Sequence, residues 1–222
     1  MEILGAGIWA ALTAAAACIA EKRFIPSRIS RDQTVQSVTA ETAGEMPRWV
    51  ILLACLWAAF CGAVATQNIL VPVSMFRACA GFAVLAFIAV TDYLLLIIPN
   101  IASMVLILCQ LAAIGWELMR GSEALPLLGG SVVAALICLA LLGFLSLVSR
   151  NGIGMGDVKL LGALAFLCGL RAAFFTLLLG MLLCAGAAAF LLLTRKKKLK
   201  DSIPLGPALW AGYGISILLT LA

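Results

Sequence analysis

The sequence contains no histidine and few charged residues of either sign. Only 11% of its 222 residues are charged, whereas a soluble domain carries roughly a quarter. The missing histidine excludes Ser-His and Cys-His nucleophile pairs and the HExxH zinc site. Any chemistry that the chain performs must therefore depend on other side chains.

Cysteine is present, but never in the spacing of a metal or disulfide site. All eight cysteines fall in or beside apolar runs and no two form a CxxC pair: Cys18, Cys55, Cys61, Cys79, Cys109, Cys138, Cys168 and Cys184. They are best interpreted as buried, inert thiols. The glycines of "GIGMGD" do not satisfy GxGxxG, and no GK[ST] follows them. We expect no metal, no cofactor and no nucleic-acid partner.

Long apolar runs dominate what is present. Hydrophobic residues make up 64% of the chain, with a mean hydropathy of +1.17. Several runs exceed the roughly 18–20 residues that cross a bilayer core, where helices satisfy their own backbone hydrogen bonds. The sequence predicts an all-α polytopic membrane protein with about eight spans: 3–20, 49–66, 78–97, 100–116, 125–148, 158–170, 172–194 and 203–221.

The distribution of lysine and arginine predicts the orientation of these spans. Basic residues concentrate in the polar loop 21–48 and in the run "RKKKLK" at 195–200. Cytoplasmic loops carry such an excess, and eight spans with both termini outside place these two loops inside. Arg77 and Glu117 then fall in outer connections. The run from Ile3 to Ala20 has no basic start, so we expect it to remain as the first span.

The organisation expected from this count is a single membrane domain, 1–222. Residues 1–77 would form two N-terminal helices joined by the cytoplasmic loop 21–48, and 78–222 would form the core. The basic run at 195–200 is interpreted as a topology anchor that contacts anionic lipid.

Two carboxylates lie where a membrane protein rarely has them. Asp92, in "AVTDYLLLIIPN", falls near the cytoplasmic end of the third span, and Asp157, in "GMGDVKLL", opens the sixth span at the same face. An ionisable residue at such a depth is a candidate functional site. Two close carboxylates share one proton, so that one can act as a base while the other polarises a carbonyl group.

Other interpretations of these residues stay open at this point. Asp157 is well placed to cap a helix, and Lys159 to extend toward the headgroups. The two aspartates also fit a proton or ion pathway in a transporter or a secretion-assembly component.

Three sequence segments also resemble motifs of a known protein family. "GIGMGDVKLLGALAF" resembles the GxGD motif of membrane aspartyl proteases, in the GxGDxKL form of the prepilin peptidases. Gly154, Gly156 and Asp157 match the motif, and Lys159 completes its longer form. "TDYLLLIIPN" and "SIPLGPAL" are similar to two further segments of that family, in the same order. The resemblance covers roughly residues 78–221.

The resemblance implies a membrane endopeptidase that removes the short basic leader of prepilin-like proteins at the cytoplasmic face of the cell membrane. Asp92 and Asp157 would be catalytic. The implied supporting residues are Gly154, Gly156, Lys159, Pro99, Asn100, Pro204, Gly206 and Pro207. The implied partners are the prepilin-like substrate and the bilayer. The substrate groove is expected where Asp92, the Gly154–Gly156 loop and the "IPLGP" segment meet.

One departure from the family is clear. Many bacterial members carry a cytoplasmic domain with two CxxC pairs between their first two helices, a domain associated with N-methylation. The loop 21–48 of this chain contains no cysteine. The sequence therefore predicts a peptidase without methyltransferase activity.

Overall fold

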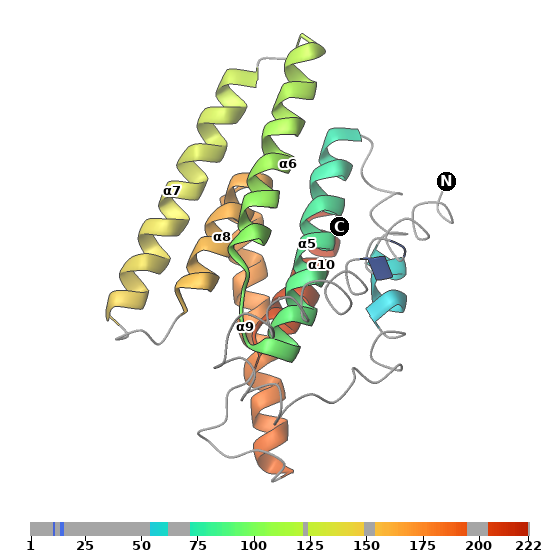
Figure 1. Cartoon of the computed structure of the whole chain (residues 1–222), viewed down its shortest axis with the longest axis vertical. Helices are drawn as coiled ribbons and strands as arrows, with labels where there is room; N and C mark the ends of the chain where they lie inside the picture. The colour runs from blue at the N-terminus through green and yellow to red at the C-terminus, as the bar shows by residue number, and fades with distance from the viewer. Residues whose placement is uncertain are drawn as a thin grey trace, which may run out of the picture.

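The computed structural model describes residues 11, 14–15, 54–61, 72–121, 124–148, 154–194 and 204–221. Its helices are α5 (Pro72–Leu95), α6 (Asn100–Met119), α7 (Ala124–Val148), α8 (Met155–Cys168), α9 (Leu170–Leu193) and α10 (Gly206–Leu221). Residues 54–61 are also helical, and no strand occurs among the described residues. The predicted all-α fold is confirmed for this part of the chain (Figure 1).

Four of these helices are long and apolar enough to cross a membrane. They cover Val73–Leu95, Asn100–Met119, Leu125–Val148 and Leu170–Leu193. Helix α10 is apolar but shorter, and the 14 residues of α8 extend only about 21 Å, less than the roughly 30 Å of a bilayer core. The spans predicted at 3–20 and 49–66 lie mostly outside the described residues, so the count of eight and the positions of the termini stay predictions.

Helix α8 forms the centre of the bundle. It contacts α5, α6, α7 and α9, and in Figure 1 it lies behind the gap between α6 and α7. Apolar side chains surround it, as expected for a helix without a solvent face. Its buried residues are Val158, Leu160, Leu161, Gly162, Ala163, Leu164, Ala165, Phe166 and Leu167. The start of α8, which carries Asp157, is thus held from several sides.

Helices α9 and α10 pack against each other through their backbones at a pair of glycines. A Cβ atom added to Gly212 would lie 2.7 Å from the Gly180 backbone nitrogen and 2.9 Å from the Thr176 carbonyl oxygen. Small residues at such a crossing let membrane helices approach each other directly. Because α10 also packs along α5, its first residues reach the last turn of α5.

The structure corrects two predicted helix boundaries. Helix α5 begins at Pro72 and α6 continues to Met119, so Arg77 and Glu117 lie on helices rather than in outer connections. Arg77 Nη2 is 3.0 Å from Glu117 Oε2, and Arg77 Nε donates to Gln110 Oε1 at 2.9 Å. Paired charges are tolerated inside a helix bundle, which is why a search for uninterrupted apolar runs began α5 too late and ended α6 too early.

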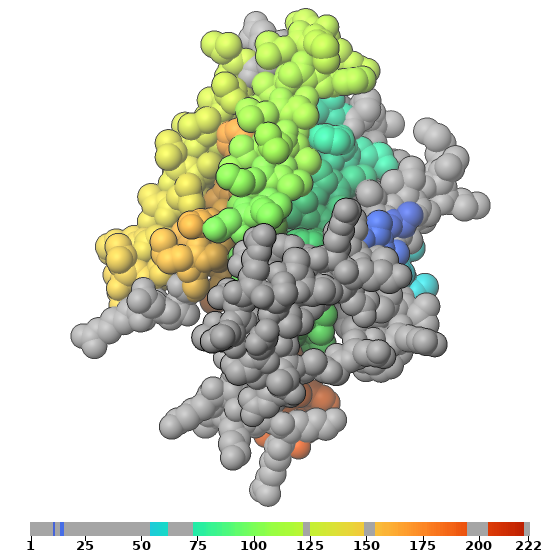
Figure 2. All heavy atoms as spheres, in the orientation of Figure 1, coloured from blue at the N-terminus to red at the C-terminus, as the bar shows by residue number. Residues whose placement is uncertain are grey.

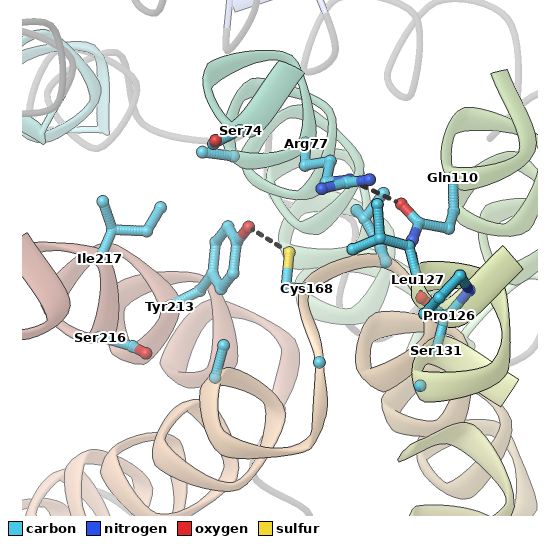
Figure 3. A pocket seen from close by; sticks show the side chains of 15 residues that line it. Ser74, Arg77, Gln110, Pro126, Leu127, Ser131, Cys168, Tyr213, Ser216 and Ile217 are labelled. Atoms are coloured by element: carbon cyan, nitrogen blue, oxygen red, sulfur yellow. Dashed lines mark hydrogen bonds between the residues drawn. The ribbon is translucent and has the colours of Figure 1, made fainter. Parts of the chain in front are cut away.

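Arg77 and Gln110 line a cavity of about 500 Å³ (Figure 3). Gln110 Nε2 donates in turn to Ser131 Oγ at 2.9 Å, which extends the network from α6 to α7. Across the cavity, the Cys168 thiol and the Tyr213 hydroxyl are 3.0 Å apart. Fifteen residues separate Arg77 from Asp92 along α5, which corresponds to about 22 Å. The cavity is therefore remote from the aspartates.

The replacement Arg77→Met should destabilise the bundle by about 3 kcal/mol, because it leaves the largely buried Glu117 carboxylate without its cation. Thermal unfolding in detergent micelles measures the loss. The double replacement Arg77→Met/Glu117→Leu should recover most of it. The control Arg120→Met removes an exposed cation beside Trp116 and should change stability by less than about 1 kcal/mol. Equal stability of Arg77→Met and the control would contradict a structural role for the pair.

Candidate active site

Asp92 lies in the last turn of α5, with its side chain almost fully buried. Only 7% of the residue is exposed. The helix ends just after it: the amide of Leu96 donates to the Asp92 carbonyl oxygen at 2.9 Å, and Leu96 has a φ of 52°. This left-handed conformation costs a residue with a Cβ atom on the order of 1 kcal/mol or more. Pro99 then prevents the chain from continuing as a helix and becomes the N-cap of α6.

Asp157 lies in the first turn of α8. The N-cap of this helix is Gly154, and no side chain caps it by a hydrogen bond. Asp157 therefore does not act as the N-cap residue. Among the described residues, no group donates a hydrogen bond to its buried Oδ1 atom.

The two aspartates share one cavity of about 300 Å³. It lies where the end of α5, the start of α8 and the residues before α10 meet, at the lower end of the bundle in Figure 1. Its lining residues are Asp92, Leu96, Ile98, Gly154, Gly156, Asp157 and Leu205. Figure 2 shows that the side chains of α6 and α7 cover most of α8 on this face of the molecule.

Two glycines make this convergence possible. A Cβ atom at Gly156 would lie 3.3 Å from Ile98 Cβ, so the start of α8 packs tightly against the segment after α5. A Cβ atom at Gly206 would lie only 2.8 Å from Asp92 Cβ and 3.1 Å from the Ile88 carbonyl oxygen. In this position the Gly206 amide donates a hydrogen bond of 2.6 Å to Asp92 Oδ2. The first residue of α10 is thereby attached to the carboxylate.

Asp157 lies outside the four membrane-crossing helices, and its surroundings disfavour its charge. Burial, and secondarily the neighbouring Asp92 carboxylate, raise the pKa of Asp157 from 3.8 to about 6. Both effects oppose a second negative charge in the same cavity. The raised pKa means that the Asp157 carboxyl group retains its proton to a higher pH than an ordinary aspartate does.

The remaining predicted site residues are distributed more widely. Lys159 and Asn100 line a separate groove of about 510 Å³ between α6, α7 and α8, and Lys159 is exposed. Pro204 precedes α10, and Pro207 is its second residue. The basic run at 195–200 lies outside the described residues.

Sequence reasoning missed Leu96, and it also missed the Arg77 network. Nothing in an unbroken apolar run marks Leu96 as the residue with positive φ that lines the cavity. The signal for Arg77 and Glu117 was present, because two opposite charges bordered consecutive apolar runs. Opposite charges that border consecutive apolar runs can indicate an ion pair between neighbouring helices.

The arrangement provides two carboxyl groups in a small, partly enclosed space. Such a pair can hold one proton and activate water for attack on a carbonyl carbon. Among the described residues, no three metal-ligating side chains of His, Cys, Asp or Glu gather in one place.

Comparison with known proteins agrees with the resemblance. The protein-family model described as "Type IV leader peptidase family" matches residues 79–189, a range that contains both aspartates. The chain is also similar to the prepilin leader peptidase/N-methyltransferase of Bacillus subtilis (strain 168). The two are 31% identical over 182 residues, which cover 78% of this chain and 67% of that protein. No solved structure shows a significant match.

Proposed function

The chain belongs to the type IV leader peptidase family, and on this premise we propose that it is an aspartic endopeptidase that cleaves leaders from prepilin-like precursors. The observation that carries the proposal is the cavity shared by Asp92 and Asp157, two residues that are 65 positions apart in the sequence. One carboxylate accepts a proton from water while the other carboxyl group donates to the scissile carbonyl oxygen. No cofactor is needed for this hydrolysis.

A location in the membrane suits a substrate that itself contains an apolar helix. The chain has several helices of membrane-crossing length, and the cavity lies at one end of them. A precursor whose apolar segment enters the bilayer would present the adjoining leader junction at this depth. We propose that this end faces the cytoplasm, in accord with the basic runs at 21–48 and 195–200.

The proposed activity is limited to proteolysis. The Bacillus subtilis relative is named as both a leader peptidase and an N-methyltransferase. The loop 21–48 of the present chain lacks the cysteine pairs associated with the second activity in the family.

Asp92→Asn and Asp157→Asn should each abolish leader removal while leaving membrane levels near normal. Asparagine keeps the size of the side chain but can neither accept the proton from water nor share one. A tagged precursor, with a short basic leader ending in glycine before an apolar helix, reports cleavage by its mobility on an immunoblot. Asp32→Asn, a carboxylate in the polar loop, is the matched control and should process normally. Cleavage by either active-site variant would refute the dyad and favour the transport interpretation.

Reporter fusions should place residues 35 and 198 in the cytoplasm and residue 120 outside. The physical reason is the excess of lysine and arginine in the first two regions. An external signal at residue 198 would place the proposed site on the wrong side of the membrane for a cytoplasmic leader.

Processed substrate should carry an unmodified N-terminus. Intact-mass measurement of the mature product, after co-expression in cells without another prepilin peptidase, distinguishes a free amine from an amine with one added methyl group. A methylated product would show that the cysteine pairs are dispensable for methyl transfer.

A further inference from the structure

The two aspartates have unequal hydrogen-bonding environments. Asp92 Oδ2 accepts the 2.6 Å hydrogen bond from the Gly206 amide, whereas Asp157 Oδ1 is buried without a partner. A hydrogen bond from an amide favours the charged form of a carboxyl group, because an amide can only donate. The same cavity therefore stabilises charge on one aspartate and withholds that stabilisation from the other.

The amide belongs to the start of a 16-residue helix, α10. The N-termini of α10 and α8 both carry partial positive charge, which favours an anion at either aspartate. The direct hydrogen bond from the Gly206 amide is therefore what distinguishes Asp92 from Asp157. Pro207 follows Gly206 and has no N–H group, and the amide of Leu209 already donates to Leu205. The Gly206 amide, the first of α10, donates to Asp92 rather than within the helix.

The contact requires glycine. Any Cβ atom at position 206 would meet Asp92 Cβ at 2.8 Å, a distance that real Cβ atoms do not show. A larger residue would have to displace either the aspartate or the start of α10. The same Cβ atom would also lie 3.1 Å from the Ile88 carbonyl oxygen, so rotation of the Asp92 side chain cannot relieve the clash, and the start of α10 would have to move away from the last turn of α5. That movement lengthens the hydrogen bond between the amide and the carboxylate.

We propose that the Gly206 amide assigns the roles within the pair: it holds Asp92 as the ionised base and leaves Asp157 as the protonated acid. The inference rests on the proposed peptidase function. Gly206 acts as a positioning residue, through Asp92. The groups facing Asp92 that can change charge, among the described residues, are Asp157 on α8 and the Cys184 thiol on α9.

The assignment gives a balanced reaction. Asp92 accepts a proton from water as the water oxygen bonds to the carbonyl carbon, while Asp157 donates its proton to the carbonyl oxygen. The resulting diol then collapses: Asp92 passes its proton to the leaving nitrogen as the C–N bond breaks, and Asp157 recovers a proton from a diol hydroxyl. Both aspartates return to their initial states.

Infrared difference spectroscopy tests the assignment without measuring activity. At a pH of about 5, exposed carboxyl groups are mostly ionised, so a protonated carboxyl band reports the buried pair. In purified protein, Asp157→Asn should lose this band and Asp92→Asn should keep it. Loss in Asp92→Asn with retention in Asp157→Asn would overturn the proposal by reversing the roles, even if both variants are inactive as the dyad requires.

The role of Gly206 is tested by Gly206→Ala. Its kcat should fall by roughly ten- to a hundredfold with little change in KM, because a charge-assisted hydrogen bond to the base is lost. The acidic limb of its kcat/KM profile should move to higher pH, as Asp92 then accepts a proton more readily. The control Gly186→Ala, on an exposed face of α9 with no atom within 4 Å of the new Cβ, should behave as the parent. A folded Gly206→Ala protein with an unchanged pH profile would show that the amide does not set the charge of Asp92.

Discussion

A carboxylate buried near the end of an apolar helix is the constraint on which the rest of this structure depends. Asp92 is almost fully enclosed, and an unpaired charge there would cost several kcal/mol. The structure offsets part of this cost with a hydrogen bond from the backbone amide of Gly206. Because an amide carries no net charge, it lowers the basicity of a carboxylate less than a neighbouring lysine or arginine would. In the proposed mechanism, Asp92 is therefore stabilised as an anion and can still accept a proton.

This solution imposes demands on residues far from Asp92. The amide reaches the carboxylate only because position 206 lacks a side chain, and because α10 lies directly against α9 at Gly180 and Gly212. On the other side of the cavity, Gly156 lets the start of α8 approach Ile98. Each glycine sets the position of a whole helix. The cavity is therefore built by rigid elements whose separations are fixed by backbone contact, as precise chemistry requires.

The sequence predicted much of this and missed the rest for physical reasons. Apolar runs located all the helices from α5 onward, and the rarity of membrane carboxylates singled out Asp92 and Asp157. The distance between these two residues could not be predicted, because they are 65 positions apart in the sequence and only tertiary packing brings their helices together. The conformation of Leu96 was equally hidden, because leucine normally avoids positive φ. Arg77 was misplaced because pairing with Glu117 makes a charge tolerable where hydropathy alone excludes it.

The bundle has two polar clusters, one around Arg77 and one around the two aspartates, and they differ in how completely their polar groups are hydrogen-bonded. In the Arg77 cluster the guanidinium group, the Gln110 amide and the Glu117 carboxylate all have partners on neighbouring helices. Such a network has little left to offer a substrate. At the other end, no group among the described residues donates to the buried Asp157 Oδ1, which belongs to a side chain that lines the cavity. If Asp157 holds the proton of the pair, as we propose, that proton can pass to a carbonyl oxygen bound in the cavity.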